Sequence, residues 1–193
     1  MGKQADQGKA SVPTPDRIAF ITMHEVEKDV FRGAALVTDG RSKPVEFRCT
    51  SPIQPNAVQR TLYGKSLRPH MALDLSGLPL LKSLKESAQI VMVDHEDLLE
   101  LRRFVSVPVF WVRKQGAEVE ARQSNPQSEE LLSCDSGKFQ PLVLTPHWEF
   151  PSDADTWRTA IRAAFAVADL AEPFERAKTA LSIVHEKSIS SGR

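Results

Sequence analysis

The sequence is poor in cysteine, and its positive and negative charges cancel. Its 193 residues contain two cysteines, Cys49 and Cys134, which lie too far apart for the close spacings that metal and redox sites use. Such sparse use predicts two reduced thiols in a cytoplasmic protein. The 25 Lys and Arg residues balance 25 Asp and Glu residues, so the chain as a whole has no electrostatic preference for nucleic acid or for an acidic membrane.

Long apolar runs and recognisable cofactor motifs are also missing. No apolar run approaches the roughly 18 residues of a membrane-spanning helix, and the polar segment 1–15 has no signal-peptide core and is expected to be disordered. There is no Gly-x-Ser-x-Gly elbow, and none of the five histidines has a second ligand at zinc-site spacing. We therefore expect a cytoplasmic protein with no cofactor, no membrane contact and no small-molecule ligand.

Apolar periodicity and turn residues predict an α/β fold. Three strands at 17–23, 32–39 and 45–50 form an antiparallel meander, because period-two alternation flanks an Asp-Gly turn. Two or three short helices follow over 56–86, and the apolar runs 89–94 and 106–112 are typical of buried parallel strands. We expect a mixed α/β domain at 16–121, a polar linker at 122–138, and a segment 139–193 with one short strand and a C-terminal helical hairpin.

This order of elements resembles the opening of the ribonuclease H-like fold. The resemblance implies metal-binding carboxylates on the first strand, the first helix and the end of the fourth strand. Asp94 stands at the last of these places. The first predicted strand has no acid, and the helical stretch 56–76 contains only Asp74. Because two-metal hydrolysis needs several converging carboxylates, the sequence predicts this architecture without its chemistry.

The acidic run at 94–97 is the best candidate for a hard cation. Its carboxylates are Asp94, Glu96 and Asp97, and a metal-dependent hydrolase around Asp94 is one interpretation of the chain. The same acids would also favour the start of a helix, where the backbone dipole attracts negative charge. Because such acidic runs are more often the start of a helix, the sequence favours that interpretation over a metal site.

A local excess of positive charge lies between residues 32 and 70, where seven Lys and Arg residues accompany two acids. Asp39 suits the hairpin turn, and Glu46 falls on the exposed face of a strand between basic neighbours. Nucleic-acid binding through this basic face, by a degenerate nuclease-like domain, is a second interpretation, and docking to an acidic protein is equally compatible. The candidate contacts are Arg41, Lys43, Arg48, Arg60 and Lys65.

The last helix carries an apolar seam that suits packing along another helix. It packs either on the preceding helix of the same chain or on another subunit. Because no active site is recognisable, the main interpretation is a non-catalytic accessory or adaptor subunit of a bacterial multi-protein assembly. The seam residues, and candidate partner contacts, are Leu170, Phe174, Ala177, Leu181 and Val184.

The stretch LVTDGRSKPVEFRCTSP through QRTLYGKSL, within residues 33–67, resembles a family of small bacterial proteins with no assigned activity. The resemblance implies a bacterial, cytoplasmic origin. It implies no functional residue.

Overall fold

The computed structural model describes residues 15–117, 129–134 and 136–191. The N-terminal segment expected to be disordered lies outside them except for Pro15. The strands are β1 (Arg17–Glu27), β2 (Val30–Asp39), β3 (Pro44–Cys49), β4 (Ile90–Val93), β5 (Val109–Lys114), β6 (Glu130–Leu132) and β7 (Leu142–Pro146). The helices are α1 (Ala57–Tyr63), α2 (Leu67–His70), α3 (Leu78–Ser83), α4 (Ser152–Val167) and α5 (Glu172–Ser191), with 3-10 helices η1 (Gly64–Ser66) and η3 (Glu96–Phe104) and the π-helix η2 (Met71–Gly77).

One mixed sheet of seven strands, in the order β3-β2-β1-β4-β5-β7-β6, organises the described residues. β1, β4 and β5 run parallel, while β2, β3, β6 and β7 join by antiparallel pairing. The carboxyl ends of the three parallel strands therefore meet at one edge of the sheet, where open α/β folds place their sites. This order confirms the predicted α/β class, with its antiparallel opening meander and ribonuclease H-like arrangement.

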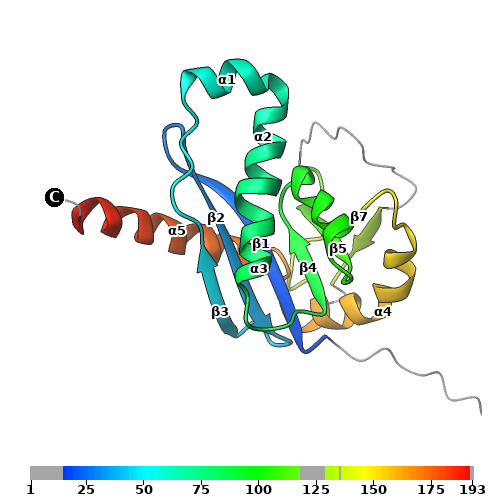
Figure 1. Cartoon of the computed structure of the whole chain (residues 1–193). Coiled ribbons are helices and arrows are strands. Elements are labelled where there is room, and N and C mark those ends of the chain that lie inside the picture. The colour runs from blue at the N-terminus through cyan, green and yellow to red at the C-terminus, as the bar shows by residue number, and fades with distance from the viewer. Residues whose placement is uncertain (1–14, 118–128, 135, 192–193) are drawn as a thin grey trace, which may run out of the picture.

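Helices cover both faces of the sheet (Figure 1). Ile18 and Phe20 of β1 face α4 and α5, and Phe20 meets the ring of Phe174 edge to face at 5.3 Å. Ala19 and Ile21 alternate with them and face the helical stretch 71–84 and η3. The strands of the parallel centre are therefore apolar on both faces, which explains the continuous apolar runs in the sequence.

The helices expected over 56–86 form one interrupted arm from α1 to α3. Asn56 begins the arm with a reciprocal capping box to Gln59. No residue of α1 is buried, and Figure 1 shows α1 at the top of the view, beyond the strands. Farther along, η2 lies close against β2 because Gly33 has no side chain; a Cβ there would lie 2.8 Å from the Cβ of Ser76.

The C-terminal third extends the same sheet and covers it. β6 lies inside the segment expected to be a linker, and β7 pairs with β5, so the expected boundary at 122–138 divides one continuous sheet. α4 contacts β6 and β7, whereas α5 contacts β1 and β2. The predicted C-terminal helices are present, and both are layers of this domain. Among the described residues no helix has the length and apolarity to cross a membrane.

The apolar seam of α5 is used within the chain, which corrects the expectation that it contacts a partner. Four of its residues are at most 3% exposed, because they pack on β1, β2 and the neighbouring core; Val184 is half-buried. The four are Leu170, Phe174, Ala177 and Leu181. The seam spacing was therefore a sign of packing against a sheet.

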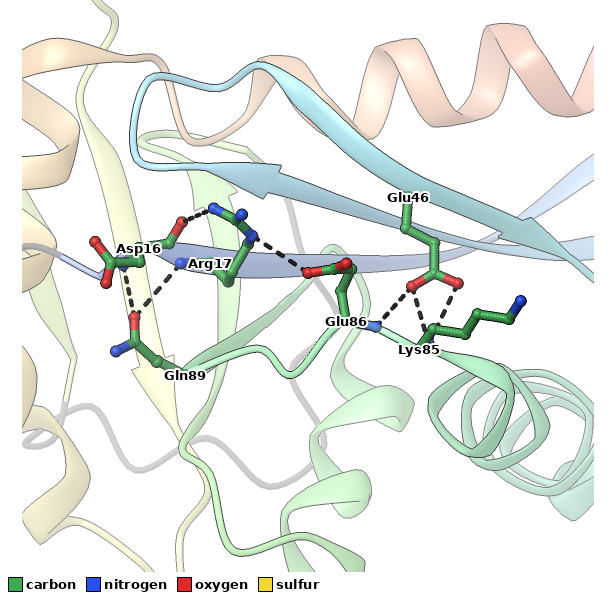
Figure 2. Close-up of polar contacts among 6 residues, drawn as sticks. All are labelled: Asp16, Arg17, Glu46, Lys85, Glu86 and Gln89. Carbon is green, nitrogen blue, oxygen red and sulfur yellow. Dashed lines mark hydrogen bonds and ion pairs between the residues drawn. The ribbon is translucent and has the colours of Figure 1, made fainter.

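Both acids of the opening hairpin are structural. Asp39 Oδ1 accepts hydrogen bonds from the backbone amides of Lys43 and Arg41. These bonds hold the pKa of Asp39 below its usual value, and the bond from Lys43 has the larger effect. Figure 2 shows Glu46 reaching from β3 to the segment before β4, where its carboxylate accepts the amides of Lys85 and Glu86. Glu46 therefore ties the sheet edge to the segment that enters the central strand.

Gln89 makes a similar connection beside it. Its side-chain Oε1 accepts the backbone amide of Asp16 at 2.6 Å, and Arg17 Nε lies 3.5 Å from Glu86 Oε2 (Figure 2). These contacts hold the start of β1 against the start of β4. They add to the backbone pairing of the two strands that carry the site described below.

We predict that Glu46→Gln lowers the melting temperature at neutral pH, because an amide is a poorer acceptor for two backbone N–H groups. The hydrogen bond from the amide of Glu86 is the largest cause that lowers the pKa of Glu46. Burial raises this pKa, but Arg48 and Lys85 lower it further, so the net pKa is below its usual value. A carboxylate with a lowered pKa stabilises the fold above its ordinary value of 4.5 and loses that contribution as pH falls through the folded value.

Thermal denaturation from neutral pH to about pH 3 should therefore show a difference between wild type and variant that disappears in acid. Glu186→Gln, at an exposed position, serves as the control and should match wild type throughout. A difference that persists at the acid end would contradict this role of the Glu46 charge.

Candidate functional site

A polar contact interrupts the apolar centre of the sheet at the carboxyl ends of β1 and β4. The register pairs Ile21 with Val93, so Thr22 and Asp94 come next along the two parallel strands. Thr22 is fully buried, and its Oγ1 donates a hydrogen bond of 2.8 Å to Asp94 Oδ2. Both side chains face α5, because Phe20 and Met92, two residues earlier, pack in the core on that side.

Lys178 of α5 completes this contact. Its Nζ lies 2.9 Å from the same Asp94 Oδ2 and 3.5 Å from Glu175 Oε1. The side chains of Lys178 and Asp94 are 27% and 16% exposed, so the pair is largely shielded from water. We call Thr22, Asp94 and Lys178 the central triad.

The ammonium of Lys178 is a stable cation in this setting. Partial burial lowers the pKa of Lys178, but the charge of Asp94, its hydrogen bond and then Glu175 outweigh burial, so the net pKa is raised. Lys178 therefore stays protonated at physiological pH. It cannot serve as the neutral amine that a general base requires.

The residues at the expected metal positions do not fit a divalent cation. The β1 residue next to Asp94 is Thr22, which supplies a hydroxyl and no carboxylate. Asp74, on the arm, bonds His70 at 2.7 Å, and Asp94 is engaged by Lys178. Within residues 15–117, 129–134 and 136–191 no group of three His, Cys, Asp or Glu side chains could hold a metal ion. The described residues therefore do not offer the several oxygen ligands that a hard cation requires.

The rest of the acidic run begins a helix. His95 is the N-cap of η3, and its Nδ1 accepts the backbone amide of Asp97 at 3.2 Å. Burial, then Arg68, lowers the pKa of His95, while the neighbouring acids oppose the change, and a neutral ring agrees with its role as acceptor. Asp97 lies 3.9 Å from Arg68, and Glu96 is the first residue of η3. The structure therefore agrees with the interpretation that the acids of this run stand at the start of a helix.

A basic groove lies between the β1–β2 hairpin and the helical arm, on the face of the sheet opposite to the central triad: Met23, which lines it, packs with the arm-side core, whereas Thr22 faces α5. Its volume is about 900 Å³. Arg60 crosses from α1 to Asp29 in the hairpin turn at 3.0 Å and bridges the two walls. Lys28 and Lys65 make no ion pair with any residue that the structure describes. The charged and titratable lining residues are His24, Glu25, Glu27, Lys28, Arg60, Lys65 and Arg68.

The structure divides the basic face expected from the sequence. Arg60 and Lys65 line the groove, but Arg41 and Lys43 lie in the β2–β3 turn, at the opposite end of the hairpin. Arg48, on β3, donates to Glu46 at 2.7 Å. The five candidates therefore do not form one surface, because the length of the β1–β2 hairpin separates Arg41 and Lys43 from the groove.

The groove and the triad also contain residues that the sequence analysis missed. Lys28 and Arg68 line the groove, and Thr22 and Lys178 form the triad. Lys178 carried a readable signal: it follows Phe174 by four residues and precedes Leu181 by three, so it falls on the buried face of the helix. A lysine on such a face requires a buried partner.

The sheet order, the meander and the covering helices define an α/β fold of the ribonuclease H type. No protein-family model matches the chain, and no curated protein sequence matches it. Among solved structures the chain is similar to human ENDOV, at 15% identity and a TM-score of 0.58, over 97% of this chain and 91% of the human protein.

A second similar structure is endonuclease V of Ciona intestinalis in complex with a 24mer DNA that contains an inosine followed by a ribo-adenosine. Identity is 13% and the TM-score 0.55, over 94% of this chain and 90% of that chain. The catalytic domain of human endonuclease V is also similar, at 15% identity and a TM-score of 0.55, over 97% of this chain and 89% of that chain. At these identities the comparisons establish the fold.

We predict that Lys178→Met destabilises the fold by about 1–3 kcal/mol, between the values for an exposed and a buried ion pair, since Asp94 keeps an unpaired charge. A lysine with a raised pKa stabilises the fold below its ordinary value of 10.5 and loses that contribution as pH rises through the folded value.

Chemical denaturation should therefore give a constant difference between wild type and variant around neutral pH that shrinks only above about pH 10.5. The exposed Lys82→Met is the control and should stay near wild type. A Lys178→Met variant as stable as wild type would contradict the importance of this pair.

Proposed function

We propose that this protein binds nucleic acid in the groove between the β1–β2 hairpin and the helical arm, and does not cleave it. The observation that carries the proposal is the concentration of Lys28, Arg60, Lys65 and Arg68 in one groove of a nuclease-like fold. The groove adjoins the carboxyl edge of the parallel strands, the usual place for ligands in such sheets.

The charge of the groove is a local property of a chain with no net charge. Four Lys and Arg side chains line it against two carboxylates, Glu25 and Glu27. Glu25 Oε1 accepts the amide of Asp29, and Glu27 lies 3.3 Å from His185, so both acids are engaged within the protein. Lys28 and Lys65, which make no ion pair with the described residues, are then the groups best placed to neutralise phosphates.

The central triad supports binding without cleavage. Two-metal phosphodiester hydrolysis needs carboxylates that converge on metal ions, and here Asp94 is paired with Lys178 while Thr22 replaces an acid. The similar Ciona protein was crystallised with DNA. That complex supports nucleic acid as the class of ligand and suggests inosine-containing DNA as one probe.

The accessory-subunit interpretation loses the surface on which it rested, because the α5 seam is buried in its own domain. A protein partner would have to use another face. The bacterial and cytoplasmic origin implied by residues 33–67 stays a prediction.

We predict that Lys28→Glu/Lys65→Glu weakens nucleic-acid binding by roughly tenfold or more and lowers the salt dependence, by about one unit of log–log slope per lost phosphate contact. Fluorescence anisotropy with a labelled 24-nucleotide DNA strand, its duplex, an RNA of the same sequence and the inosine-containing strand measures this. Arg41→Glu/Lys43→Glu makes the same change in charge outside the groove and should leave affinity within about twofold of wild type.

Two outcomes would overturn the proposal. Failure of wild type to bind any of these strands at about 50 mM salt would remove nucleic-acid binding, because phosphate contacts are strongest at low salt. Cleavage of a strand in Mg²⁺ or Mn²⁺ that Asp94→Asn abolishes would remove the non-cleaving part.

A further inference from the structure

The centre of the sheet already contains a cation, and that cation belongs to the protein. Asp94 and Glu175 both face Lys178 Nζ, at 2.9 and 3.5 Å. Without the ammonium, the carboxylate of Asp94 at the end of β4 and that of Glu175 on α5, whose side chain is 68% exposed, would lose the cation that they share. Their negative charge is the charge that a divalent ion would otherwise neutralise.

The contacts at Asp94 occupy one of its two carboxylate oxygens. Oδ2 accepts from Thr22 Oγ1 at 2.8 Å and from Lys178 Nζ at 2.9 Å, which uses both lone pairs of that oxygen. Oδ1 is buried and accepts no hydrogen bond from the described residues. A divalent ion could reach Asp94 only through this single oxygen and would lie close to the ammonium, which repels it.

We propose that Thr22 and Lys178 together replace the divalent-cation site of this nuclease-like fold with an internal ion pair. These two residues decide that the site takes no Mg²⁺ or Mn²⁺. The inference goes beyond nucleic-acid binding and does not depend on it, since it concerns what neutralises Asp94. It implies that folding, and any ligand binding, proceeds unchanged in the presence of a chelator.

Thr22 and Lys178 do not form a catalytic pair in which the lysine activates the threonine hydroxyl as a nucleophile. Thr22 has no exposed surface, and its hydroxyl hydrogen points to Asp94. Nucleophilic activation needs a neutral amine that accepts that hydrogen, whereas Lys178 remains charged between two acids. The pair therefore holds charge in place and moves no proton.

Titration calorimetry with MnCl₂ tests the proposal. Wild type should give no saturable binding. Thr22→Asp/Lys178→Ala provides carboxylates from β1, from the end of β4 and from Glu175 on α5, and should bind one Mn²⁺ roughly tenfold or more tighter than wild type. Its melting temperature should then rise with Mn²⁺ concentration, since the ion binds only the folded state. Thr61→Asp/Lys82→Ala makes the same change in charge at exposed positions and should bind no Mn²⁺.

Lys178→Met provides a second test that needs no new carboxylate. Removal of the ammonium leaves Asp94 and Glu175 without their cation, so millimolar Mn²⁺ should raise the lowered melting temperature of this variant and leave that of wild type unchanged. Asp94→Asn/Lys178→Met should recover stability without metal and should not respond to Mn²⁺.

Each contrary result overturns the inference. Saturable Mn²⁺ binding by wild type that Asp94→Asn abolishes would show that the ion pair does not exclude metal. A folded Thr22→Asp/Lys178→Ala variant with the Mn²⁺ affinity of wild type would show that residues other than Thr22 and Lys178 exclude the metal ion. If that variant does not fold, the absence of Mn²⁺ rescue in Lys178→Met decides against the proposal.

Discussion

The ion pair between Lys178 and Asp94 connects the last helix to the centre of the sheet, and the arrangement of the site depends on it. α5 covers β1 and β2 through apolar contacts, which slide easily along a sheet face because they have no direction. The ion pair has direction, and together with the contacts of His185 with Glu27 and of Arg176 with Ser42 it fixes the helix along β1. Thr22 shares the same carboxylate oxygen and extends the contact to β1. One carboxylate thus holds two strands and a helix together.

The proposed binding of nucleic acid and the proposed exclusion of metal depend on different residues. Binding of a charged polymer needs cations along a groove, and Lys28, Lys65 and Arg68 line one beside the hairpin. Hydrolysis needs metal ions held by several carboxylates, and the triad offers an ammonium where a metal ion would be needed. The groove and the triad lie on opposite faces of the sheet, and in the groove Lys28 and Lys65 make no ion pair with the residues that the structure describes.

Sequence patterns predicted the elements better than their arrangement. The alternation in 45–50 and the Asp39 turn predicted the hairpin correctly, because both depend on neighbouring residues. The seam of α5 showed correctly which residues are buried but not what buries them, since a helix presents the same stripe to a sheet as to another helix. Glu46 was assigned to the exposed face, but it accepts amides some 40 residues away, a contact without a local signal.

By itself the sequence determined the α/β class, the hairpin and the apolar central strands, because each is a property of residue types at short spacing. Only the tertiary structure decided that residues 22, 94 and 178 meet at one oxygen and that the basic face divides between the two ends of the hairpin. Such contacts depend on strand order and on the docking of α5. The physical reason is that charge acts through space, while periodicity records only which face of an element is buried.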